Sequence, residues 1–274
     1  MVSAPHFLSI ENEETSSFSN EQLSQVDAKT ETYGHWHRRA GTGLLCGVLN
    51  IRPDRDFSGR RMDAVRRHAI ATFSRPHGGN LDENLRRLVA AMSKLTREDV
   101  GLDVKLMRDI REAPVTYVSI QEHEDVTISM FVLRHRSQLP LHDHPLMYGI
   151  IKVVSGIIEI KNYSFIEDPT ESLRQQEVLV KREPPRIISE TDPPILLTPT
   201  KGNIHEITCR HSAGAAFVDV LAPPYGTLVP SLGPRSCFYY FESDEQPANP
   251  ETARFIKSLE HPEFWTDVAP YCGQ

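Results

Sequence analysis

The chain has 274 residues, of which 39% are hydrophobic and 24% are charged, and its formal net charge at pH 7 is −7. A chain of this length can bury a sizeable core without disulfides or a structural metal. The acidic balance argues against a nucleic-acid partner, because phosphate binding requires a concentrated positive field. No apolar run approaches the roughly 20 residues that a membrane-spanning helix needs, so we expect no membrane association.

The first 33 residues are acidic, because Lys29 is their only lysine or arginine against six aspartates and glutamates. Signal peptides need an apolar stretch and transit peptides are basic, and this segment has neither character. It predicts a solvated, disordered tail over residues 1–40, followed by a single catalytic domain over residues 41–274.

Two amphipathic helices are predicted next. Apolar residues recur at spacings of three and four from Met62 to Phe73, and the motif Arg75-Pro76 ends this run. Asn80 is placed to cap a second helix, in which apolar residues from Leu81 to Leu95 form one stripe. Such stripes are typical of packing faces, so residues 60–102 are predicted to form a helical cover over a sheet.

The pattern then changes to short apolar or alternating runs that are separated by Pro, Gly, Asn and Asp. Examples are residues 126–133, 149–154, 206–209 and 215–221. Several short strands with turns between them indicate a mainly β sandwich or barrel, here over residues 112–242. Residues 243–274 are polar and proline-rich and are predicted to form a C-terminal extension with one short helix, Pro250 to Leu259.

Four cysteines occur, at positions 46, 209, 237 and 272. None forms a Cys-x-x-Cys pair, which argues against a zinc ribbon or a thioredoxin-type motif. Their wide and irregular spacing also differs from a secreted disulfide framework. A reducing location is expected, in the cytoplasm with the nucleus as a second compartment.

The most informative segment is Leu-His-Asp-His-Pro at residues 141–145. Side chains alternate between the faces of a strand, so His142 and His144 point the same way and Asp143 points the opposite way. Two imidazoles on one face can bind a metal, although two surface histidines would show the same spacing. Downstream, Gly202-Asn203-Ile204-His205 leads into another predicted strand and offers a third imidazole.

These segments resemble the two sequence motifs of the cupin barrels, whose first motif has a His-x-His pair followed by a glutamate. The glutamate position is Gly149 here, which cannot bind a metal. Three neutral imidazoles leave a divalent iron with its full charge, which should favour an anionic sulfur ligand. Within the cupin barrels, three-histidine binding is the hallmark of thiol dioxygenases.

Runs near the end of the barrel sharpen the resemblance. Ala-Phe-Val-Asp-Val-Leu-Ala-Pro-Pro-Tyr at residues 216–225 and Cys-Phe-Tyr-Tyr at residues 237–240 are similar to the 2-aminoethanethiol dioxygenase family, which includes the plant cysteine oxidases. The resemblance implies a cupin barrel that uses Fe(II), held by His142, His144 and His205, and O₂. The implied reaction converts cysteamine, or the N-terminal cysteine of a protein, to a sulfinic acid.

Four further residues are candidates for the catalytic site. Asp219 shares a strand face with Phe217 and Leu221, and a carboxylate inside the barrel needs a partner such as a substrate ammonium or a water at the metal. A structural Asp bonded to backbone is the alternative. Tyr225 follows two prolines at a strand exit, where the resemblance implies that it positions substrate or oxygen; an ordinary loop aromatic is the alternative.

Cys237 and Tyr239 are two residues apart and share one face of a strand. In animal members of the family, residues at these positions can carry a thioether cross-link, while packing in the core is the alternative for Cys237. Other functions stay open at this point: a metal-dependent cupin that acts on a non-thiol substrate, or a non-catalytic cupin that senses a small molecule. We expect a monomer.

Overall fold

The structure is a computed structural model that describes residues 55–74, 80–103, 105–108, 113–259, 262 and 264–273. The predicted tail and Cys46 lie outside these residues. Four helices are described: α1 (Arg55–Phe73), α2 (Leu81–Met92), α3 (Lys105–Arg108) and α4 (Pro169–Arg174).

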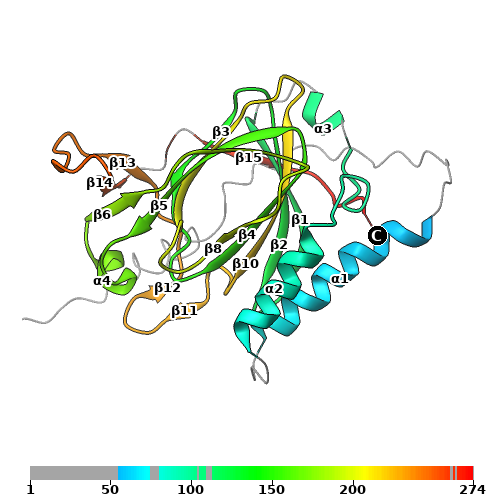
Figure 1. Cartoon of the computed structure of the whole chain (residues 1–274), viewed down its shortest axis with the longest axis horizontal. Helices are drawn as coiled ribbons and strands as arrows, with labels where there is room; N and C mark the ends of the chain where they lie inside the picture. Colours follow the sequence, from blue (N-terminus) through cyan, green and yellow to red (C-terminus); the bar gives the residue numbers. More distant parts are fainter. Residues whose placement is uncertain are drawn as a thin grey trace, which may run out of the picture. The chain divides into compact units, whose positions relative to one another are not determined.

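Most strands belong to two sheets (Figure 1). The first contains, in spatial order, β15 (Thr266–Val268), β1 (Val115–Glu122), β2 (Thr127–Leu133), β10 (Ala215–Ala222), β4 (Tyr148–Ser155) and β8 (Ile195–Leu197). The second contains β13 (Tyr240–Glu242), β14 (Thr252–Lys257), β6 (Glu177–Arg182), β5 (Ile157–Phe165), β9 (Ile204–Cys209) and β3 (Gln138–His142), with β7 (Arg186–Ser189) paired to β5. A separate hairpin joins β11 (Leu228–Val229) to β12 (Gly233–Pro234).

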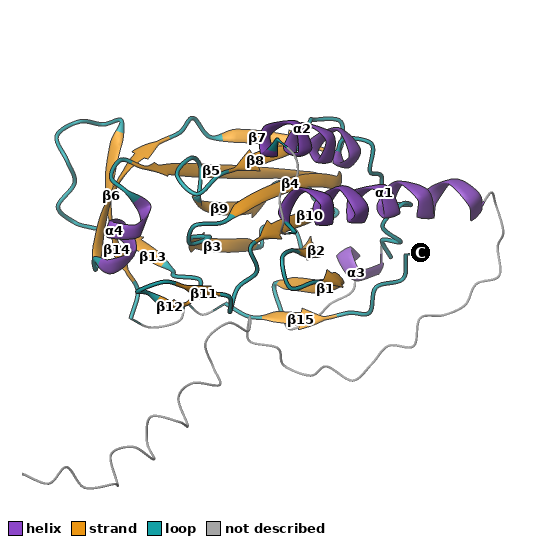
Figure 2. Ribbon diagram, turned by 90° about the horizontal axis from the view of Figure 1, so that it is seen from below, coloured by secondary structure: helices purple, strands orange, loops and turns teal. Residues whose placement is uncertain are grey.

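The two sheets enclose an apolar interior, and helices α1 and α2 cover the outer face of the first sheet (Figure 2). Strand β10 shows the alternation that separates these layers. Phe217 packs inside the barrel, whereas Ala216 and Val218 belong to the cluster that contains residues of α1 and α2. The predictions of a mainly β barrel and of an N-terminal helical cover are confirmed.

Helix α2 forms as its sequence pattern predicts. The side chain of Asn80 accepts a hydrogen bond from the backbone N–H of Asp82 at 3.0 Å, which caps the first turn. Leu85, Leu88 and Met92 are buried against the sheet. Burial of each such side chain contributes about 1.5–3 kcal/mol, so packing holds this helix more strongly than its cap does.

The predicted helix from Pro250 to Leu259 is wrong, because this segment contains strand β14. Its residues pair with β6 on one side and with β13 on the other. Ala253 and Phe255 are fully buried on one face, in a third apolar cluster with residues of β6. The two-sided pairing outweighs a local preference for helix that ten residues can express only weakly.

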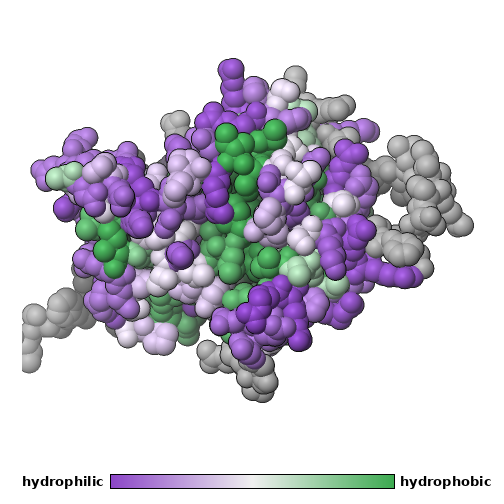
Figure 3. All heavy atoms as spheres, in the orientation of Figure 1, coloured by the Kyte–Doolittle hydropathy of each residue, from purple (hydrophilic) through white to green (hydrophobic). Residues whose placement is uncertain are grey.

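Among the described residues, no helix is both long and apolar enough to cross a bilayer. On the face in Figure 3, hydrophilic side chains surround a central band of apolar ones. Ile187 in β7 and Leu196 in β8 are among the exposed apolar side chains of the chain.

Candidate metal centre

Three histidines meet inside the barrel. His142 is the last residue of β3 and lies opposite His205 of β9 in the antiparallel register, and His144 follows two residues later. The ring centroids are 4.5–5.0 Å apart, and the nitrogens that could bind a metal all lie within 4.8 Å of one another. Because the two strands are directly paired, distant parts of the sequence bring their imidazoles to one point.

Burial keeps these rings neutral. All three residues are at most 2% exposed. Loss of hydration lowers the pKa of His142 to about 4 and lowers the pKa values of His144 and His205 well below the ordinary value. Neutral imidazoles carry the lone pair that metal binding requires, so the site is ready to accept a cation at neutral pH.

Hydrogen bonds to Nδ1 determine which nitrogen can bind the metal in two of the rings. The Nδ1 atom of His142 lies 2.7 Å from the carbonyl oxygen of Pro140, to which it can only donate. The Nδ1 atom of His144 lies 2.6 Å from the hydroxyl of Tyr225, which itself donates to the carbonyl of Asp143 at 2.9 Å. Both rings are therefore protonated at Nδ1, and Nε2 carries the lone pair.

The third ring completes the set. The Nε2 atoms of His144 and His205 are 3.5 Å apart. Two nitrogens bound about 2.1 Å from one ion and at right angles would lie about 3 Å apart, so a small inward movement would allow both to bind it. A divalent transition metal suits this donor set, because imidazole is one of its preferred ligands.

Gly149 occupies the position at which a cupin glutamate would stand. A Cβ atom there would lie 3.1 Å from a methyl group of Leu197 and 3.3 Å from one of Leu221, which is tighter than most side chains tolerate. Among the described residues, the buried cluster of possible metal ligands contains His142, His144 and His205 and no carboxylate. Packing around Gly149 therefore preserves the three-histidine set.

Asn203 is a residue of the site that the sequence interpretation missed. Its Oδ1 accepts a hydrogen bond from the backbone N–H of His144 at 3.1 Å, and its Nδ2 donates to the carbonyl oxygens of His144 and Thr198. It is fully buried and joins the loop that carries His144 to the strand that carries His205. The sequence contained a signal for this residue, because Asn203 stands two positions before His205 and is therefore expected on the same face of an extended chain.

Asp219 shares its strand face with Phe217, which packs inside the barrel, and its carboxyl group accepts a hydrogen bond from the backbone of Val220. The carboxylate is 4% exposed, and its Oδ1 atom makes no hydrogen bond within the described part of the chain. Burial raises the pKa of Asp219 to about 8. The same carboxylate is one of the groups that raise the pKa of Tyr225.

Tyr225, Cys237 and Tyr239 gather on one side of the histidines. Tyr239 forms an isolated bridge with His142, and their ring centroids are 6.3 Å apart. Burial raises the pKa values of Tyr225 and Cys237 well above their ordinary values. A side-chain hydrogen bond between these two groups also influences both pKa values. Cys237 likewise raises the pKa of Tyr239. The structure thus brings the three histidines, Tyr225, Cys237 and Tyr239 to one region, and Asp219 lies within electrostatic range of Tyr225.

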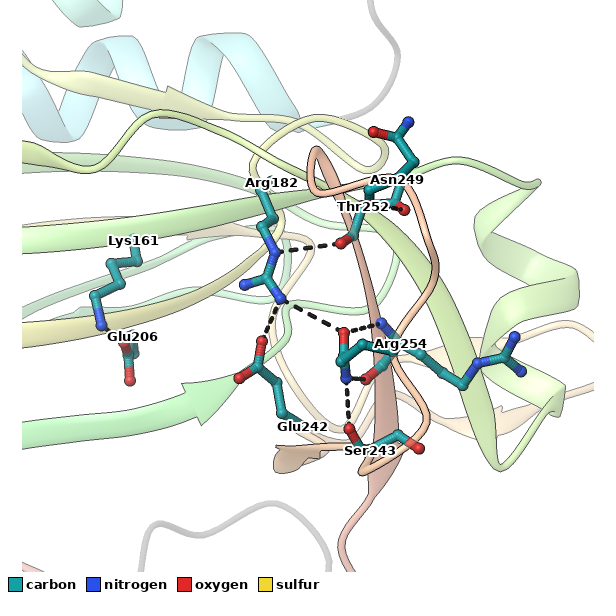
Figure 4. Close-up of polar contacts among 9 residues, drawn as sticks. Lys161, Arg182, Glu206, Glu242, Ser243, Asn249, Thr252 and Arg254 are labelled. Carbon is teal, nitrogen blue, oxygen red and sulfur yellow. Dashed lines mark hydrogen bonds and ion pairs between the residues drawn. The ribbon is translucent and has the colours of Figure 1, made fainter.

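A second concavity lies on the opposite face of β3 and β9 from the histidines. This cavity of about 570 Å³ is lined by aromatic side chains of Tyr163, Tyr240 and Phe255 and by charged residues. Lys161 pairs with Glu206 at 2.6 Å, and Arg182 pairs with Glu242 (Figure 4). These charged side chains pair with one another.

The fold and the site together define a cupin barrel with a buried three-histidine metal centre. The PCO_ADO family model matches residues 89–273. The 2-aminoethanethiol dioxygenase of Mus musculus is 30% identical over 259 residues, which cover 80% of this chain and 97% of that protein. Plant cysteine oxidase 2 of Arabidopsis thaliana is 31% identical over 168 residues, 58% of each chain.

The chain belongs to the PCO_ADO family. The resemblance drawn from the sequence motifs is therefore confirmed. Among solved structures, a cupin superfamily protein from Desulfitobacterium hafniense has a TM-score of 0.30 and 12% identity, over 42% of this chain and 82% of that one.

Proposed function

We propose that the protein is an Fe(II)- and O₂-dependent thiol dioxygenase that converts an amino-thiol to its sulfinic acid. The observation that carries this proposal is the buried cluster of three neutral histidines with a glycine at the usual carboxylate position. The family relatives support it, since they are named 2-aminoethanethiol dioxygenase and plant cysteine oxidase. In the overall reaction both atoms of O₂ are added to one thiolate sulfur, so atoms and charge balance.

His142, His144 and His205 would hold the iron. When bound, a divalent iron supplies open positions at which a thiolate and O₂ can meet. The three imidazoles add no negative charge, so the site stays electropositive towards an anionic sulfur. Tyr225 fixes the orientation of the His144 ring through the hydrogen bond to Nδ1.

Asp219 would bind the substrate amine. An ammonium in an apolar barrel needs a compensating charge, and the Asp219 carboxylate is buried without a hydrogen-bond partner for Oδ1 among the described residues. Entry of the ammonium would lower the pKa of this carboxyl and leave the pair charged. Cysteamine and the N-terminal cysteine of a protein share this arrangement of a thiol two carbons from an amine.

Cys237 and Tyr239 would line the same chamber next to the metal. Cys209 and Cys237 form no disulfide among the described residues, and we propose a reducing compartment such as the cytoplasm for this protein. We also propose that the protein acts as a monomer.

Metal analysis combined with O₂ uptake tests the proposal. Purified protein should contain about one iron per chain and consume O₂ when cysteamine or a Cys-initiated peptide is added, with the thiol mass increasing by two oxygen atoms. Replacing His205 with alanine should remove most of the iron and the O₂ uptake, since one of only three protein ligands is lost. A His205→Ala variant with full iron and activity would contradict the proposed centre.

A further inference from the structure

Asp143, the residue between His142 and His144, binds a segment that lies 95–97 residues later in the chain. Oδ1 of Asp143 accepts a hydrogen bond from the backbone N–H of Phe238 at 2.8 Å, and Oδ2 accepts one from the hydroxyl of Tyr240 at 2.7 Å. The backbone N–H of Asp143 donates in return to the carbonyl of Phe238 at 3.1 Å. Asp143 is fully buried, so these bonds form without competition from water.

These contacts determine which side chains face the metal centre. The backbone of Phe238 and the hydroxyl of Tyr240 contact Asp143, and the side chains of both residues pack in the third apolar cluster. In an extended segment the residues between and before them must point the other way. Tyr239 accordingly bridges to His142, and Cys237 lies beside Tyr225.

Strand β14 supports the segment from behind. Its last residue, Lys257, lies opposite Tyr240 in the register and places Nζ 4.7 Å from the ring centroid of Phe238. The same ammonium donates to the carbonyl of Leu173 at 2.7 Å, which holds it in place. Its positive charge also faces Asp143 and partly offsets the cost of burying that carboxylate.

We propose that Asp143 is a positioning residue that clamps residues 237–240 so that Cys237 and Tyr239 face the three histidines. The clamp consists of the two hydrogen bonds to its carboxylate oxygens. The proposal rests on the proposed function only for the use of Cys237 and Tyr239 in turnover. The placement itself can be measured without substrate or O₂.

The test compares the reactivity of two buried thiols. Cys209 is buried in the barrel interior away from the clamp and reports general loosening, whereas Cys237 reports the clamped segment. Cys46 and Cys272 are replaced by serine, and the full chain is loaded anaerobically with Fe²⁺. Iodoacetamide labelling of each remaining thiol is then followed by peptide mass spectrometry, in a preparation whose Cys237 is unmodified.

Asp143→Ala should accelerate labelling of Cys237 by roughly tenfold or more, because loss of two hydrogen bonds releases the segment and exposes the thiol. Labelling of Cys209 should stay unchanged. Asp143→Asn should restore slow labelling, because its Oδ1 can still accept from Phe238 and its Nδ2 can donate to the hydroxyl of Tyr240. This rescue separates a hydrogen-bonded clamp from a purely electrostatic effect of Lys257.

Asp192 offers a matched control, since its carboxylate also accepts one backbone N–H and one hydroxyl, both from Ser189, in a turn far along the sequence. Asp192→Ala should leave both thiols unreactive. The clamp is refuted if Cys237 labels slowly in Asp143→Ala, if Asn behaves as Ala does, or if Cys209 accelerates in parallel. Should Asp143→Ala fail to fold, Tyr240→Phe removes one of the two bonds, and wild-type labelling of Cys237 in that variant would equally refute it.

Discussion

Replacing Asp219 with asparagine should change how the stability of the metal-free protein depends on pH. The carboxyl group is buried at 4% exposure, and its Oδ1 atom makes no hydrogen bond within the described residues. Burial raises its pKa to about 8 in the folded protein, whereas an Asp in an unfolded chain has a pKa of about 3.9. An asparagine of the same shape has no proton to release.

The magnitude follows from proton linkage. Between the two pKa values the folded protein retains a proton that the unfolded chain has lost, so raising the pH favours unfolding. Each pH unit in this window lowers the free energy of unfolding by about 1.36 kcal/mol. From pH 5 to pH 7, wild type should therefore lose about 3 kcal/mol relative to Asp219→Asn, whatever constant offset the new amide adds.

Urea unfolding of both metal-free proteins at pH 5, 6 and 7 measures this difference. Asp192→Asn is a suitable control, because hydrogen bonds from Ser189 lower the pKa of Asp192 and the carboxylate is ionised in both states over this range. Its loss should shift the curve by a constant amount. Parallel curves for wild type and Asp219→Asn would show that Asp219 is not held protonated in the empty barrel.

Three other predictions concern the groups around the histidines. Asn203→Ala should weaken Fe²⁺ binding by roughly 10- to 100-fold in chelator competition, because the loop of His144 loses its anchor; unchanged affinity would contradict that role. Tyr225→Phe should retain iron but lower kcat/KM by about tenfold, since one hydrogen bond to a ligand ring is lost; wild-type kinetics would argue against it. If Cys237 and Tyr239 couple during turnover, the intact mass should fall by two hydrogens, and an unchanged mass after many turnovers would leave Cys237 as a packing residue.

Local patterns in the sequence were sufficient for the metal ligands and the helical cover. The side chains of a strand alternate, so the His-x-His spacing alone places His142 and His144 on one face. The apolar stripe of α2 likewise follows from the period of a helix, and Asn80 marks its start. These properties depend on residues within a few positions of one another.

Relations between distant residues needed the folded structure. Asp143 points away from His142 and His144, as its position predicts, but the sequence does not show that Phe238 and Tyr240 bind it. The local sequence of β14 favours a helix for the same reason, since only the pairing of this segment with β6 and β13 makes it extended.

The sequence by itself therefore determined the fold class, the family and the histidine set, because these are expressed in periodicity and short motifs. Only the tertiary structure decided what surrounds the histidines. The tautomer of His142, the raised pKa of Asp219 and the pairing of Tyr239 with His142 all depend on burial and on contacts across the barrel. Desolvation and hydrogen bonding depend on which residues are close in space, and the order of residues along the chain does not show this by itself.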